Sequence, residues 1–175
     1  MSKDRPHAID VTIDNDQWCD LGHLSKDLGP DQKKWDEVAW TSFFERILLK
    51  VAAVLGVDKP FGLSILLTDN HHIQELNHNF RGKNKPTNVL SFPSGIEHPS
   101  PDGFFFLGDV AFAHDVIVEE SNTEKKIFLN HMTHLTIHGI LHLLGYDHEI
   151  PAEAETMENL EILILSHFNI RNPYT

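Results

Sequence analysis

The chain has 175 residues, of which 41% are hydrophobic and 23% charged, so it has the composition of a globular domain that is long enough to bury a core. Its formal net charge of −12 argues against broad, nonspecific nucleic-acid binding. We find no apolar run of membrane-spanning length and no apolar segment of the signal-peptide kind, and the single cysteine, Cys19, cannot form an internal disulfide. These features predict one cytoplasmic domain over residues 1–175 with no membrane partner.

Hydrophobic periodicity and turn residues predict the secondary structure. In chain order, the expected elements are a strand at Ile9–Ile13, a loop at 15–33, a helix at Trp35–Leu55, a strand at Phe61–Thr68, a helix from an Asp69 cap to about Phe80, a strand at Asn88–Phe92, a loop at 93–103, a strand at Gly108–Ala113, and helices at about 114–120, 124–144 and 152–167. The loop at 93–103 is rich in Pro and Gly and is expected to be mobile.

The order of these elements, β-α-β-α-β-β-α-α-α, predicts an α+β fold. We expect a single domain with a small mixed β-sheet and a central histidine-bearing helix packed among several helices. The sequence leaves the order of the strands within the sheet open.

The expected helix at 124–144 carries the start of the most informative motif, which runs from His138 to His148 and contains HGILHLLGYDH. Positions i and i+4 share one face of a helix, so His138 and His142 can hold one metal ion. Gly145 can adopt the left-handed conformation that ends a helix, which makes His148 the natural third ligand. Three imidazoles with an open fourth position are typical of a catalytic zinc site. We therefore predict a hydrolase with one Zn²⁺, Ni²⁺ being the alternative ion.

Two more histidines share this helix face. His131 lies about 10 Å along the helix axis from His138, too far to be a ligand of the same ion. His134 is one turn from His138 and is a candidate to face the substrate or to support a ligand. The alternative for the whole set is a row of core histidines that bond backbone carbonyls. The run of glutamates after the motif, from Glu149 to Glu161, is expected to form a solvated face.

The spacing of the three histidines also occurs in metzincin proteases, which carry a catalytic Glu directly after the first histidine. Here that position is Gly139, so an ordinary metzincin mechanism does not apply. Asp147, beside the third histidine, is a candidate to accept a proton during catalysis. It is equally a candidate to orient an imidazole, and we favour this second role slightly.

A cluster of basic residues at 81–85 stands out in this acidic chain. The guanidinium of Arg81 can hold a phosphate through two hydrogen bonds and stabilise charge in phosphoryl transfer. Lys83 and Lys85 add positive charge, and Ser91 offers a hydroxyl that could bond RNA or only cap a turn. The alternative is an exposed basic turn without a function.

Two blocks of this sequence resemble the YbeY endoribonuclease family. One runs from His131 to His148 and contains HMTHLTIHGILHLLGYDH, and the other runs from Leu76 to Pro93 and contains LNHNFRGKNKPTNVLSFP. The resemblance implies a bacterial, metal-dependent endoribonuclease specific for single-stranded RNA. It also implies a role in ribosomal RNA maturation, notably at the 3′ end of the small-subunit RNA, and in ribosome quality control. The three motif histidines would bind the metal, and Arg81 would be the other functional residue.

The leading hypothesis is thus hydrolysis of ribosomal RNA by Arg81 and Asp147 at a metal held by the three histidines. The residues expected to bind substrate are Lys83, Lys85, Ser91 and His134. The expected partners are single-stranded RNA and the ribosomal subunit or ribosome-associated proteins, with no DNA. One alternative is a metzincin-like metalloprotease or other metallohydrolase. Another is a non-enzymatic, ribosome-associated binding module whose metal only stabilises the fold.

Overall fold

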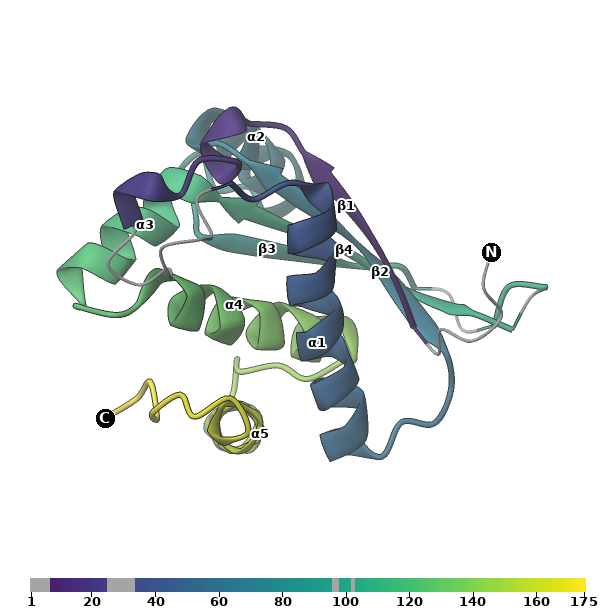
Figure 1. Ribbon diagram of the computed structural model, residues 1–175. Helices are drawn as coiled ribbons and strands as arrows, with labels where there is room; N and C mark the ends of the chain where they lie inside the picture. The colour runs from purple at the N-terminus through teal and green to yellow at the C-terminus, as the bar shows by residue number, and fades with distance from the viewer. Residues whose placement is uncertain (1–6, 25–33, 96–97, 102) are drawn as a thin grey trace.

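The computed structural model describes residues 7–24, 34–95, 98–101 and 103–175, and it confirms an α+β fold (Figure 1). The strands are β1 (His7–Ile13), β2 (Phe61–Thr68), β3 (Val89–Pro93) and β4 (Phe105–Ala113). The helices are α1 (Glu37–Leu55), α2 (Asn70–Arg81), α3 (His114–Thr123), α4 (Phe128–Leu143) and α5 (Pro151–Ser166). Their order along the chain is the expected one.

The four strands form one mixed sheet in the order β1-β2-β4-β3. The pairs β1–β2 and β2–β4 are parallel, whereas β3 pairs antiparallel with β4. β4 begins at Phe105, three residues before the expected start at Gly108, and its pairing with β2 continues through a register shift just before that glycine. Gly108 has a φ of 138°, and a Cβ at this position would lie 2.1 Å from the carbonyl oxygen of Phe92. Only glycine fits at such a bulge, so the residue that suggested a strand start is an interior irregularity.

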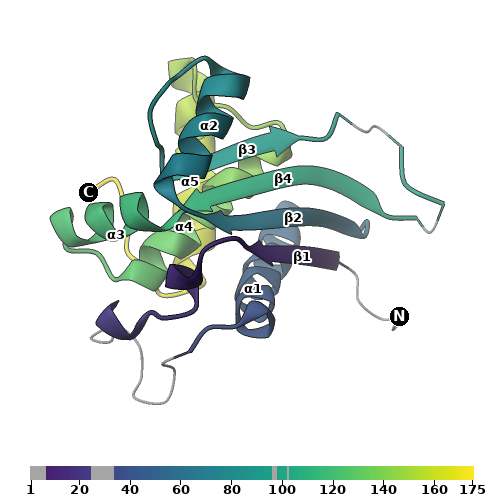
Figure 2. The same cartoon turned by 90° about the horizontal axis from the view of Figure 1, so that it is seen from above.

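Helices cover both faces of the sheet (Figures 1 and 2). α1 and α4 lie on one face, α5 packs on α4 farther from the sheet, and α2 lies on the opposite face. α4 contacts α1, α3, α5, β3 and β4, which confirms its central position. A large apolar cluster fills the face under α1 and α4, and a smaller one around Ile73 and Leu90 fills the face under α2.

Both ends of α4 are set by left-handed residues. Lys125 has a φ of 53°, so the chain turns after α3 and the helix starts at Phe128, later than the expected position 124. At the other end Gly145 has a φ of 92°, and its N–H donates to the carbonyl of His142 at 3.0 Å. The predicted glycine stop is therefore confirmed, and it turns the chain back toward the helix face that carries the histidines.

The prediction of a loop over 15–33 is wrong for the part that the structure describes. That part contains two short 3-10 helices, Asp16–Trp18 and Gly22–Leu24. Trp18 is fully buried, and its indole nitrogen donates to the carbonyl of Thr68 at 2.9 Å. Residues 25–33 lie outside the described part of the chain. So do residues 96, 97 and 102, and the mobility expected for 93–103 stays a prediction.

None of the helices in the described ranges combines the length and apolar character needed to cross a membrane.

Candidate metal centre

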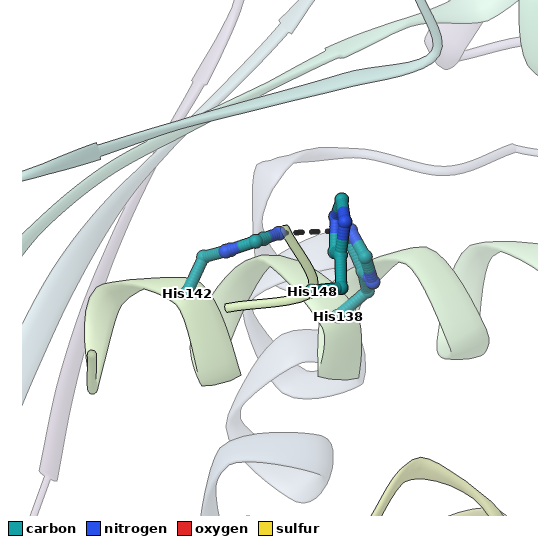
Figure 3. A group of neighbouring side chains, drawn as sticks. All are labelled: His138, His142 and His148. Atoms are coloured by element: carbon teal, nitrogen blue, oxygen red, sulfur yellow. Dashed lines mark hydrogen bonds between the residues drawn. The ribbon is translucent and has the colours of Figure 1, made fainter. Parts of the chain in front are cut away.

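The three motif histidines converge at the C-terminal end of α4 (Figure 3). His138 and His142 project from the same face of the helix, and His148 approaches from the loop that follows Gly145. Each offers one ring nitrogen, and these nitrogens all lie within 4.8 Å of one another. The ring centroids of His138 and His148 are 5.3 Å apart, and those of His142 and His148 are 4.9 Å apart. The geometry predicted from the spacing is confirmed: this is a group that could bind a metal.

The distance between the two helix ligands is close to that in a tetrahedral metal site. The Nε2 atoms of His138 and His142 are 3.1 Å apart. Two nitrogen ligands at about 2.0–2.1 Å from a tetrahedral zinc ion lie about 3.3 Å from each other, so this pair is close to the spacing that zinc requires. Imidazole nitrogens suit zinc, nickel and several other transition metals, so this donor set does not select one ion.

The pKa of His142 is lowered from its usual value. Burial is the largest cause, and the neighbouring His138 and His148 act in the same direction, while Asp147 opposes them. A lowered pKa keeps the imidazole of His142 neutral at pH 7, and the neutral form is the one that binds a metal.

A buried carboxylate, Glu161 of α5, supports the first ligand. The Nδ1 atom of His138 lies 2.7 Å from Oε1 of Glu161, and the Nε2 atom of His134 lies 2.8 Å from Oε2. The hydroxyl of Tyr174 donates to the same Oε2. Burial alone would raise the pKa of Glu161, but its hydrogen bonds to these three groups bring the pKa to about 2. Glu161 is therefore an ionised acceptor, which makes the two ring nitrogens the donors.

The prediction that the glutamate run forms a solvated face is wrong for Glu161, because the relative exposure of this residue is 0%. The buried residues of α5 are Met157, Glu161, Ile164 and Leu165, which recur at helical spacing. Glu161 thus belongs to the face of α5 that packs on α4, and this spacing was the signal that sequence reasoning missed. Tyr174, which lies far from the motif in the sequence, gave no comparable signal.

The two other histidines of α4 are bonded to carboxylates. His134 is bonded to Glu161, so the structure places it behind His138, and its expected contact with substrate stays a prediction. His131 lies apart from the three motif histidines, with its Nε2 atom 2.7 Å from Oε2 of Glu120.

Arg81 connects to α4 through one residue of β3. Its Nη2 atom donates to the carbonyl of Ser91 at 3.0 Å, and the hydroxyl of Ser91 donates to the carbonyl of Gly139 at 3.1 Å. Gly139 directly follows His138, so the two predicted functional regions meet across β3. Ser91 is buried, and its expected contact with substrate stays a prediction.

The remaining predicted site residues lie in two turns. Lys83 and Lys85 are exposed in the turn after α2, where the N–H of Lys85 donates to the carbonyl of Lys83 at 2.9 Å. The side chain of Asn77 also donates to the carbonyl of Lys85 at 2.7 Å, which fixes the backbone of this turn. Asp147 accepts a hydrogen bond from the backbone N–H of His148 at 2.7 Å, and its expected role in catalysis or in orienting an imidazole stays a prediction.

Gly139 explains why this site differs from a metzincin site. A Cβ at this position would lie 3.0 Å from Cγ1 of Val110 and 3.1 Å from Oγ of Ser91. The residue after the first histidine therefore faces the sheet, where a glutamate side chain has no room.

Comparisons with known proteins identify relatives of this chain. The family model described as "Endoribonuclease YbeY" matches residues 28–169. A curated protein of that name from Rhodopseudomonas palustris is 50% identical over 113 residues, which are 64% of this chain and 60% of that protein. Another from Bartonella bacilliformis is 38% identical over 172 residues, 96% of this chain and 97% of that protein. The solution structure of a Thermotoga maritima protein has a TM-score of 0.51 at 20% identity, covers 93% of this chain and 92% of its own, and supports the fold alone.

Proposed function

The chain belongs to the YbeY endoribonuclease family, and from this premise we propose that it hydrolyses phosphodiesters of single-stranded ribosomal RNA at one ion, Zn²⁺ or Ni²⁺, held by its three motif histidines. We place its action in ribosomal RNA maturation, at the 3′ end of the small-subunit RNA, and in ribosome quality control. The observation that carries the proposal is the convergence of the three imidazoles, which leaves a fourth position for a water or a phosphate oxygen.

In this proposal, His138, His142 and His148 hold the ion. When bound, the ion supplies Lewis acidity and lowers the pKa of a water molecule, so that a nucleophile is available at neutral pH. Glu161 keeps the proton of His138 on Nδ1, which leaves the Nε2 lone pair for coordination. Asp147 holds the backbone that presents His148.

We assign Arg81 to the phosphate. Its hydrogen bond to Ser91 uses one of the five N–H donors of the guanidinium and anchors the side chain to β3. The other donors can hold the phosphate oxygens and stabilise the charge that develops during transfer. Lys83 and Lys85 add local positive charge for the RNA backbone in a chain whose net charge is −12.

The acidity of the chain bears on its partners. With a net charge of −12 and one basic cluster, we expect weak binding to free RNA and specificity that depends on the ribosomal subunit or on ribosome-associated proteins. We expect no DNA substrate and no membrane partner.

The decisive experiment compares substrates on protein of known metal content. Single-stranded RNA with the sequence of the small-subunit 3′ end, the same RNA in a duplex, single-stranded DNA and casein are incubated with zinc-loaded protein. The proposal expects cleavage of the single-stranded RNA only. Cleavage of casein without cleavage of RNA would instead support the metalloprotease alternative. Binding to ribosomes with no cleavage of any substrate would support the non-enzymatic one.

A further inference from the structure

We propose that Glu161 is a positioning residue for the metal ligand His138, and that Tyr174 and His134 hold Glu161 in place. The inference rests on the proposed function, because it assigns these residues a role toward the ion that the motif histidines would bind. It adds α5 and the chain after it to the parts of the molecule that set metal affinity.

The first step concerns the tautomer of His138. Oε1 of Glu161 accepts from Nδ1 of His138 at 2.7 Å, so the proton of the neutral ring lies on Nδ1. The lone pair is then on Nε2, which is the atom that faces His142 at 3.1 Å. A carboxylate at this place also fixes the rotation of the ring and increases its basicity, as carboxylates behind metal-bound histidines do in general.

The second step concerns the other oxygen of the carboxylate. Oε2 of Glu161 accepts from Nε2 of His134 at 2.8 Å and from the hydroxyl of Tyr174. The rings of His134 and Tyr174 meet edge to face, with centroids 5.7 Å apart and planes at 87°. A buried carboxylate is tolerated only when such partners replace its water. Here they come from α4 and from the segment after α5, so the carboxylate is held from two sides.

The arrangement makes the metal centre depend on a residue far from the motif. Loss of the Tyr174 hydroxyl removes one of the two donors to Oε2 and leaves the carboxylate freer to rotate. A glutamine at position 161 has a stronger effect, because its NH₂ group can donate to Nδ1 of His138. That donation favours the tautomer with the proton on Nε2, which blocks coordination.

The test measures zinc affinity and the tautomer of His138, not activity alone. Glu161→Gln and Tyr174→Phe are compared with wild type and with Glu155→Gln, which makes the same change at an exposed position of α5. Zinc dissociation constants come from competition with a chromophoric chelator, and tautomers from the ring ¹⁵N shifts of histidine. We expect Glu161→Gln to weaken zinc binding about 10- to 100-fold. We expect about a 2- to 10-fold loss for Tyr174→Phe and no change for Glu155→Gln.

Each outcome bears on the proposal. Zinc affinity and His138 ring shifts of Glu161→Gln equal to those of wild type overturn it. If Glu161→Gln does not fold, Tyr174→Phe decides in the same way, since it leaves the carboxylate and its other partners in place. A wild type that binds zinc but does not cleave RNA refutes the proposed function alone. A wild type that binds no zinc refutes both.

Discussion

The hydroxyl of Ser91 donates to the carbonyl of Gly139 at 3.1 Å, and this bond ties the edge strand β3 to the helix that carries the metal ligands. The same serine accepts a hydrogen bond from Arg81 through its carbonyl oxygen. One buried residue thus sets the distance between the residue assigned to the phosphate and the helix assigned to the ion.

Because of this contact, we predict that any side chain at position 139 lowers the free energy of unfolding. Gly139→Ala places a methyl group 3.0 Å from Val110 Cγ1 and 3.1 Å from Ser91 Oγ, so these side chains or α4 must shift by a few tenths of an ångström. We expect a loss of about 1–3 kcal/mol in the free energy of unfolding, measured by urea denaturation. Removing Oγ relieves one of the two contacts, so Gly139→Ala with Ser91→Ala should lose less than the sum of the single variants. Wild-type stability of Gly139→Ala would contradict this packing.

Replacement of His142 by alanine should abolish stabilisation by zinc. A ligand that binds only the folded state stabilises it by about 2.7 kcal/mol at a free concentration 100 times its dissociation constant. We expect the melting temperature of wild type to rise with added zinc and that of His142→Ala to stay constant. His71→Ala, at a histidine whose side chain is 83% exposed, is the control and should respond as wild type does. A zinc response retained in His142→Ala would mean that the ion binds elsewhere.

Arg81 should matter for cleavage and not for metal content. We expect Arg81→Gln to hold wild-type amounts of zinc, measured by elemental mass spectrometry, and to cleave single-stranded RNA about 100-fold more slowly. Arg46→Gln is the matched control, because that guanidinium lies 5.9 Å from the ring centroid of Phe168, on another part of the molecule. If Arg81→Gln cleaved at the wild-type rate, the assignment of Arg81 to the phosphate would fail.

Glu120 gives the stability of the fold a pH dependence. Burial would raise the pKa of Glu120, but hydrogen bonds from His131 and Asn88 outweigh burial and lower the pKa. A carboxylate with a lowered pKa stabilises the fold above its unfolded pKa, and this contribution is lost as the pH falls through the folded value. We therefore expect Glu120→Gln to lower the free energy of unfolding at pH 7 by about 1–3 kcal/mol. The difference from wild type should shrink below about pH 4.

The control for this measurement is Glu119→Gln, at the exposed neighbouring position. Urea denaturation curves of both variants and of wild type between pH 7 and 3 separate a specific loss from a general charge effect. A difference between Glu120→Gln and wild type that did not change with pH would argue against the ionised carboxylate as its cause.

Local sequence signals predicted the parts of the structure that depend on local chemistry. The strand Phe61–Thr68 has the predicted bounds, Asp69 caps α2 through its bond to the N–H of His72, and Gly145 ends the metal-bearing helix. The convergence of the three histidines follows from helical spacing and that turn. Because both signals are local, the sequence alone predicted that these three histidines come together.

Features that depend on distant pairing escaped prediction. The start of β4 at Phe105 requires the bulge at Gly108, which only the neighbouring strands impose. The burial of Glu161 depends on the packing of α5 against α4, and a charged residue within an acidic run gives little sign of it. The helix from 16 to 18 forms because Trp18 enters the core beside Thr68. In each case, tertiary contacts override the local pattern.

The position of Glu161 in the chain imposes an order on assembly. The three histidines come first in the chain, and the carboxylate that accepts the proton of His138 follows on a later helix. Because α5 must dock on α4 before that bond can form, a chain in which α5 has not yet docked lacks the group that fixes the tautomer of His138. The centre is thus completed by the docking of a helix that carries none of its ligands.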